Sequence, residues 1–234
     1  MDFKTFKQDI IELPKLKRVT QEGKRVYIRE GMEAGYPSVT TITSLKSREA
    51  IRAWRERIGK KKADAITVAA NRRGTSAHKL IENYIIGEDV TAEAQPLAIS
   101  LFMQLKAQAD KSVDNLRVIE GGLMSDYLQV AGTVDLVAEF DGKLSIIDWK
   151  TSKKPKVRSH CYQYFMQAAA YAVMFEEVTK IPVPQLVIIG SSEEGDAWQF
   201  VEKRDDWIGK FMDLRQQYAT ENNESVAFSL ENVV

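Results

Sequence analysis

The stretch LQVAGTVDLVAEFDGKLSIIDWKT, residues 128 to 151, decides the fold. It contains two runs rich in Val, Ile and Leu, and the pair Asp141-Gly142 joins them. Branched apolar residues favour extended strands, and Asp-Gly is a pair that two-residue hairpin turns prefer. The stretch therefore predicts two antiparallel strands that meet at Asp141-Gly142.

Strand-like and helix-like segments lie on both sides of this hairpin. Further strands are expected at 116–124, 185–192 and 197–202, where apolar and branched residues gather. Helices are expected where apolar residues recur at helical spacing: behind an N-cap at Ser47, over about 75–86 after a break at Gly74, from Pro96, over 162–177, and from Asp205 or Asp206 to about Tyr218. This order predicts an α/β (α+β) fold, with a central mixed β-sheet flanked by helices.

The length of 234 residues, 44% of them hydrophobic, suits one large domain. We expect a single domain over 1–234 with three parts. Residues 1–36 form an N-terminal β-hairpin extension around Glu22-Gly23, residues 37–115 a helical part, and residues 116–234 the main sheet and C-terminal helices.

Composition narrows the classes of protein. Lys and Arg number 33, as do Asp and Glu, so the net charge names no partner. The single Cys161 excludes an intrachain disulfide and a cysteine-ligated iron–sulfur cluster, and it fits a reducing compartment. No run approaches membrane-spanning length, and the first residues resemble neither a signal peptide nor a mitochondrial targeting segment. We expect a cytoplasmic monomer that does not associate with membranes.

Two acids in the hairpin suggest a metal site. Asp135 lies six residues before Asp141, and Asp148 lies six after Gly142, so the turn places them opposite each other and on one face. Two carboxylates so close repel each other, and a divalent cation would offset the repulsion. Lys150 shares that face and could position a nucleophilic water. An Asp–Lys ion pair at a sheet edge is the structural alternative.

His78 and Glu82 are four residues apart and share one face of an expected helix. One imidazole and two or more carboxylates suit Mg²⁺ or Mn²⁺, one ion or two. Glu82 could supply a direct ligand or hold a metal-bound water. A histidine with ordinary packing partners is the alternative.

Basic residues gather on both sides of these motifs. From Lys46 to Lys79 there are eleven basic and three acidic residues, which favours an anionic ligand, although a solvated helix face would look the same. The residues expected to contact this anionic ligand are Arg52, Arg55, Lys61, Arg72, Arg73, Thr151, Ser152, Lys153, Lys154, Lys156 and Arg158.

The segments RGTSAH (73–78), GTVDLV (132–137), IIDWKTS (146–152) and QAAAY (167–171) together resemble the PD-(D/E)XK nuclease superfamily, in its RecB-like branch. The resemblance implies a restriction-endonuclease-like core, in which the helical part 37–115 binds DNA and residues 116–234 carry the catalytic sheet. It also implies that the anionic ligand of the basic and polar residues named above is DNA. It also implies that His78, Asp135, Asp148 and the carbonyl of Trp149 hold the metal, and that Lys150 positions the attacking water. Gln167 and Tyr171 would then help to position Lys150 or the substrate.

The function that this resemblance implies is metal-dependent hydrolysis of DNA from single-stranded ends, in replication, recombination or repair, by a protein of bacterial or bacteriophage origin. Two alternatives stay open. One is a structure-specific, flap-type endonuclease on the same scaffold, and the other is a catalytically silent nucleic-acid-binding subunit.

Overall fold

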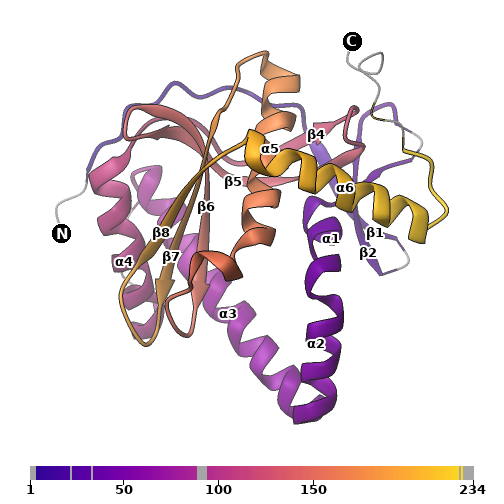
Figure 1. Cartoon of the computed structure of the whole chain (residues 1–234). Helices are drawn as coiled ribbons and strands as arrows, with labels where there is room; N and C mark the ends of the chain where they lie inside the picture. The colour runs from indigo at the N-terminus through magenta and orange to yellow at the C-terminus, as the bar shows by residue number, and fades with distance from the viewer. Residues whose placement is uncertain (1–3, 22, 33, 89–93, 227, 229–234) are drawn as a thin grey trace.

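A five-stranded mixed sheet forms the centre of the protein (Figure 1). The computed structural model describes residues 4–21, 23–32, 34–88, 94–226 and 228. The strands are β4 (Val113–Ser125), β5 (Val130–Phe140), β6 (Lys143–Ser152), β7 (Gln185–Ser192) and β8 (Trp198–Lys203), in that order across the sheet. Strands β6 and β7 are parallel, and the other neighbours are antiparallel. The predicted mixed sheet is confirmed.

The hairpin β5–β6 has the predicted register. Leu136 pairs with Ile147 and Phe140 with Lys143, which leaves Asp141 and Gly142 as the two turn residues. Both turn residues have positive φ, 49° and 75°, as this kind of tight turn requires. The turn therefore sets which residues of β5 and β6 face each other.

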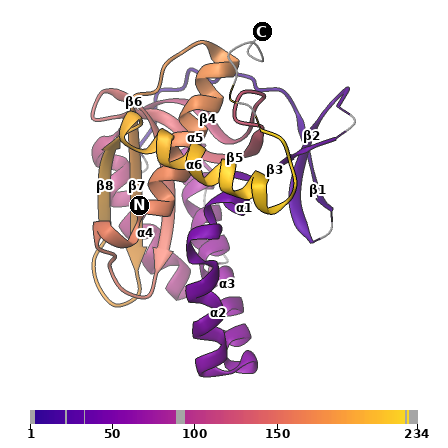
Figure 2. The same ribbon diagram turned by 45° about the vertical axis from the view of Figure 1, so that its right-hand side comes forward.

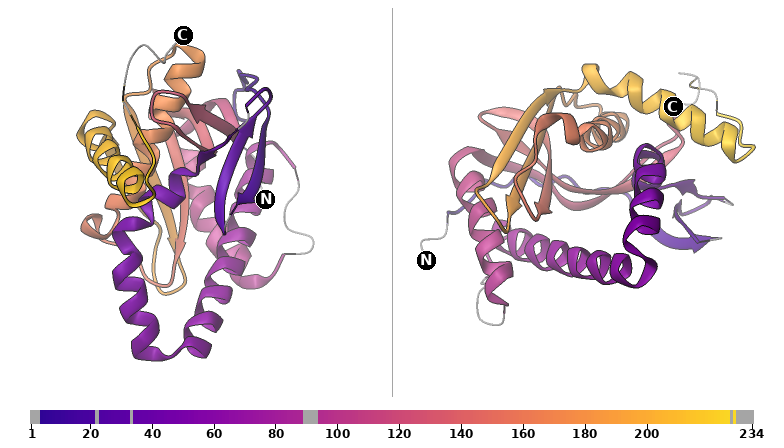
Figure 3. Two further views of the ribbon diagram at one scale, coloured as in Figure 1. Left: turned by 90° about the vertical axis from the view of Figure 1, so that its right-hand side faces the viewer. Right: turned by 60° about the horizontal axis from the view of Figure 1, so that its bottom comes forward.

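Helices cover both faces of the sheet, as the two layers in Figure 3 show. Alternate residues of β6 face different clusters: Ile146 packs with α5 and α6, whereas Ile147 packs with α3 and α4. The helices on the first face are α1 (Val39–Thr43), α5 (Tyr162–Thr179) and α6 (Asp205–Glu221), and a short 3₁₀ helix, Arg158–His160, precedes α5. Those on the second face are α3 (Lys60–Ile85) and α4 (Pro96–Ser112).

Two predicted helix boundaries are wrong. Helix α2 spans Leu45–Ile58 behind Ser44, so Ser47 is not its N-cap, and α3 continues through Gly74 without a break. A glycine inside a helix costs about 1 kcal/mol, which the five buried apolar residues that follow it in α3 outweigh. The chain turns instead at Gly59, where φ is 83°. Helix α2 buries no residue. Among the described residues, no helix is both long and apolar enough to cross a bilayer.

The N-terminal extension forms its own sheet of β1 (Leu16–Gln21), β2 (Lys24–Arg29) and β3 (Tyr36–Pro37), beside the β4–β5 end of the main sheet (Figure 2). The predicted hairpin is present, although Glu22 lies outside the described residues. Residues 7–11 run along the outer edge of β4, where Asp9 N donates to the Leu116 carbonyl at 2.9 Å. The extension thus contacts the main sheet directly.

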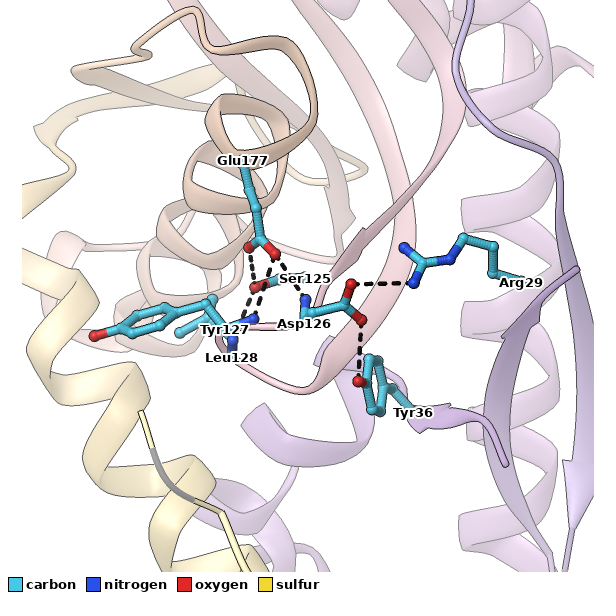
Figure 4. Close-up of polar contacts among 7 residues, drawn as sticks. All are labelled: Arg29, Tyr36, Ser125, Asp126, Tyr127, Leu128 and Glu177. Atoms are coloured by element: carbon cyan, nitrogen blue, oxygen red, sulfur yellow. Dashed lines mark hydrogen bonds and ion pairs between the residues drawn. The ribbon is translucent and has the colours of Figure 1, made fainter. Parts of the chain in front are cut away.

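A polar cluster fastens the extension to the β4–β5 turn (Figure 4). Asp126 accepts hydrogen bonds from Arg29 Nη2 and Tyr36 Oη, both at 3.0 Å. From the other side, Glu177 at the end of α5 accepts from Ser125 Oγ at 2.5 Å and Asp126 N at 2.8 Å. One turn therefore joins the extension, the sheet and α5.

Candidate active site

Three carboxylates lie abreast on three neighbouring strands. Leu136 pairs with Ile147, so the next positions, Asp135 and Asp148, face each other across β5 and β6. Ile119 pairs with Leu136 and Gly121 with Val134, which places Glu120 of β4 opposite Asp135 on its other side. The hairpin geometry thus brings together the two predicted acids, and the β4–β5 ladder adds a third.

His78 reaches this row from α3. Its Nδ1 lies 3.6 Å from Asp135 Oδ2. His78, Glu120 and Asp135 each offer one ligand atom, and these atoms lie within 4.8 Å of one another. Helix α3 runs close to the end of β6, since a Cβ on Gly74 would lie 3.6 Å from Thr151 Oγ1.

Asp148 and Lys150 form a buried ion pair beside this cluster. Lys150 Nζ lies 2.5 Å from Asp148 Oδ2, and the Asp148 side chain is only 2% exposed. Asp148 Oδ1 is buried, and within the described part of the chain it has no hydrogen-bond partner. Asp135 Oδ2 accepts a hydrogen bond from Trp149 N at 2.9 Å. The predicted placement of Lys150 and Asp148 on one face agrees with this pair.

The buried site disfavours charge on its acids. Burial raises the pKa of Asp148 to about 6, and the neighbouring charge of Asp135 adds to the effect, while Lys150 opposes it. Burial raises the pKa of Asp135 as well. Burial also disfavours the ammonium of Lys150, but the charges of Asp148 and Asp135 outweigh it and raise the Lys150 pKa. Lys150 is therefore a cation at neutral pH.

The pKa values of His78 and Glu120, the other two members of the cluster, are shifted in opposite directions. Burial, followed by the positive charge of Lys150, lowers the pKa of His78 to about 4, so the imidazole is neutral at pH 7. Partial desolvation, followed by the negative charges of Asp135, Glu82 and Asp148, raises the pKa of Glu120 to about 8, although this side chain keeps contact with solvent.

This donor set fits a divalent metal ion. Neutral imidazole nitrogen and carboxylate oxygens are ligands for Mn²⁺, and carboxylates with water suit Mg²⁺. A divalent cation here would offset the burial and repulsion that raise the pKa of each of the three acids, and it could contact the unpartnered Asp148 Oδ1. His78, Glu120 and Asp135 would hold the ion, with Asp148 adjacent.

Glu120 is the member that sequence reasoning missed. Its φ of 47° is unusual for a residue other than glycine, and it lies in a strand whose pairing shifts between Asp114 and Val118. Counting residues outward from the turn at 126–129, as for the β5–β6 hairpin, would have placed Glu120 opposite Asp135.

The remaining predicted site residues lie around this cluster. Glu82 forms an ion pair with Lys79 at 3.3 Å and lies outside the His78–Glu120–Asp135 set. Tyr171 is buried, and a Cβ on Gly132 would lie 2.8 Å from its Oη, so only glycine leaves room for it. Burial, followed by the charges of Asp135 and Asp148, raises the Tyr171 pKa well above its ordinary value, while a hydrogen bond with Gln167 opposes that rise. The roles of Gln167, Tyr171 and the Trp149 carbonyl stay predictions.

The predicted DNA-binding residues differ in whether their side chains already form ion pairs within the protein. Arg52, Lys61 and Arg72 are exposed and form no ion pair with any described residue. Others pair with acids: Arg55 with Asp64, Arg73 with Glu193, Lys153 and Lys154 with Glu194, and Arg158 with Glu202. Lys156 lies 5.2 Å from the Tyr164 ring, and Lys150 lies 5.0 Å from it.

Two polar candidates at the end of β6 differ in burial. Ser152 is buried and donates to the Lys154 carbonyl at 2.8 Å, which leaves it poorly placed to contact a phosphate. Thr151 is half-buried.

Residues 91–227, more than half of the chain, match the PD-(D/E)XK nuclease superfamily. The chain belongs to this superfamily, which confirms the family that the motifs resemble. His78 lies before the matched segment.

Among curated proteins the chain is similar to mitochondrial genome maintenance exonuclease 1. The identity is 33% over 85 residues for the human protein, which covers 36% of this chain and 25% of the relative. For the Xenopus tropicalis protein it is 27% over 128 residues, 51% of this chain and 37% of the relative. The matches thus span well under half of these relatives. A crystal structure of a provisionally assigned exonuclease from Eubacterium rectale matches with a TM-score of 0.42 and 10% identity, over 65% of this chain and 69% of that one, which is too low to add to the argument.

Proposed function

We propose that the chain is a deoxyribonuclease that depends on Mg²⁺ or Mn²⁺ and removes nucleotides from single-stranded DNA ends, as a monomer, in replication, recombination or repair. The observation that carries the proposal is the row of Glu120, Asp135 and Asp148, with His78 beside Asp135 and the Lys150 ammonium beside Asp148. Membership of the nuclease superfamily supports it, as do relatives that are named exonucleases.

Each residue has a chemical task in this proposal. A bound divalent ion would make a water nucleophilic near neutral pH and would offset the charge of the phosphate. His78 is neutral at pH 7, so its lone pair is free for a ligand bond. Lys150 remains charged, and its ammonium can orient the attacking water or a phosphate oxygen. Asp148 holds that ammonium in place.

The direct test is digestion of single-stranded oligonucleotides, labelled at either end, with Mg²⁺, Mn²⁺ or a chelator. Lys150→Ala and Asp148→Asn should each lower the rate by about a hundredfold or more. Lys143→Ala is the matched control, because Lys143 is exposed on the same strand and should leave the rate unchanged. A Lys150→Ala protein that digests DNA as fast as the parent would refute the proposed mechanism.

Covalently closed single-stranded circles separate the exonuclease from the endonuclease alternative. An exonuclease leaves circles intact while it degrades the linear form of the same sequence. Cutting of circles would establish the endonuclease instead. Tight DNA binding without turnover under either metal would favour the silent binding subunit.

A further inference from the structure

A hollow of about 600 Å³ opens between the N-terminal extension and β4, and Glu120 belongs to its wall. Glu120 also belongs to the candidate metal cluster, so the hollow and the cluster share one carboxylate. Whatever occupies the hollow therefore lies directly beside the place proposed for the reacting phosphate.

The walls of the hollow are mostly apolar. Residues from two segments form them: Ile10, Ile11, Leu13 and Leu16 from the extension, and Val118 and Ile119 from β4. Tyr27 adds an aromatic ring whose hydroxyl lies 3.4 Å from Thr133 Oγ1. Ile10 is 50% exposed, so about half of its apolar surface faces solvent. A flat apolar group fits such walls.

Polar groups are also available in the hollow. Strand β4 is an edge strand, and residues 7–11 pair with its outer edge only as far as Arg117. Beyond that point, from Val118 to Gly122, no described residue hydrogen-bonds to the outer edge of β4. Main-chain donors and acceptors of an edge strand can bind the polar rim of a ligand.

The opening of the hollow carries positive charge. Lys15 and Arg18 lie on its rim and are exposed, and neither forms an ion pair with a described residue. On β1, Lys17 lies between Leu16 and Arg18 and is not part of the hollow. The cations can neutralise phosphates on either side of a group held inside.

We propose that this hollow receives the nucleobase of a nucleotide next to the scissile phosphate, with Lys15 and Arg18 on the adjoining phosphates. The proposal rests on the proposed nuclease function and adds to it a subsite built by the N-terminal extension. Apolar walls beside an unpaired strand edge suit a base, which has two apolar faces and a polar rim. Cations outside and a metal cluster at one end suit the phosphates that flank it.

The test uses single-stranded oligonucleotides in which one abasic, tetrahydrofuran nucleotide replaces each of the last four positions in turn. If the hollow holds a base, one position should lower kcat/KM by about fivefold or more, as loss of a stacked base does. Ile10→Ala should shrink that penalty. Equal rates for all abasic strands would overturn the proposal.

Two neighbouring charge reversals supply a matched pair of variants. Arg18→Glu should raise KM severalfold and lower the salt dependence of binding, because it removes a phosphate contact. Lys17→Glu makes the same change in net charge on the opposite side of the strand and should leave both unchanged. Equal effects of the two variants would show that only long-range charge acts, which would also overturn the proposal.

Binding measured in a chelator separates this proposal from the nuclease function. Fluorescence anisotropy of the same labelled strands needs no turnover. If the protein binds DNA but never cleaves it, the nuclease proposal fails, and the abasic effect on Kd still decides for or against the hollow.

Discussion

Asp148→Asn should stabilise the metal-free protein. Burial raises the Asp148 pKa from 3.8 to about 6. The folded protein therefore holds this proton more tightly than the unfolded chain, so the stabilising contribution of protonated Asp148 is fully present below pH 3.8 and is lost as pH rises through about 6. A difference of about 2.2 in pKa corresponds to about 3 kcal/mol at higher pH. Asparagine mimics the protonated acid and removes this cost.

The assay is urea unfolding in a chelator at three pH values. The gain in unfolding free energy should be small at pH 4, larger at pH 5 and largest, about 3 kcal/mol, at pH 8. Asp141→Asn is the control, because Asp141 lies in the exposed turn of the same hairpin and its change should stay within about 0.5 kcal/mol.

A gain that is absent, or equal at every pH, would refute the reasoning that burial and charge at this site oppose folding. Mn²⁺ supplies a second check. At about a hundred times its Kd a bound ion adds about 2.7 kcal/mol. The ion should therefore stabilise the parent more than Asp148→Asn and narrow the gap between them.

Three further predictions follow from the site and its supports. With a Glu120 pKa of about 8, binding of Mn²⁺ should release most of one proton at pH 7 and much less at pH 9, as measured by calorimetry in two buffers. Glu120→Gln should abolish most of the release at pH 7, and no release from the parent would contradict this. Asp126→Ala removes the hydrogen-bond acceptor of the Tyr36 hydroxyl and should lower the free energy of unfolding by about 1–2 kcal/mol, with faster proteolysis of the N-terminal extension. Unchanged proteolysis would argue against Asp126 as the residue that fastens the extension. Gly132→Ala should displace Tyr171, lower the digestion rate about tenfold or more and cost about 1–3 kcal/mol in stability. Gly209→Ala is the control: an added Cβ there meets nothing within 4 Å, so the rate should stay unchanged.

The centre of the fold and of the site follows from sequence because local rules determine it. Asp141-Gly142 sets a two-residue turn, the turn sets the register, and the register places Asp135 beside Asp148. Lys150 follows from the twofold alternation of a strand. These inferences need no knowledge of distant packing.

The wrong or missing predictions concern features that depend on packing between segments far apart in the sequence. Gly74 reads as a break in the local pattern, yet the apolar residues that follow it hold α3 together against α4 and the sheet. Glu120 was missed because the β4–β5 turn has no two-residue turn signal from which to count the register, and because a left-handed φ at a residue other than glycine gives no sequence signal. The hollow beside it is formed by the extension, whose position depends on contacts with β4 and Asp126 that no short-range pattern encodes.

Helix α2 buries no side chain, and α3 beneath it is 26 residues long, about 39 Å at the usual rise per residue. Evolution can therefore lengthen, recharge or shorten α2 without disturbing the folding of the sheet. Under the proposed function, a DNA strand beside α2 would constrain its composition instead, and related proteins would then diverge here first when they change substrates.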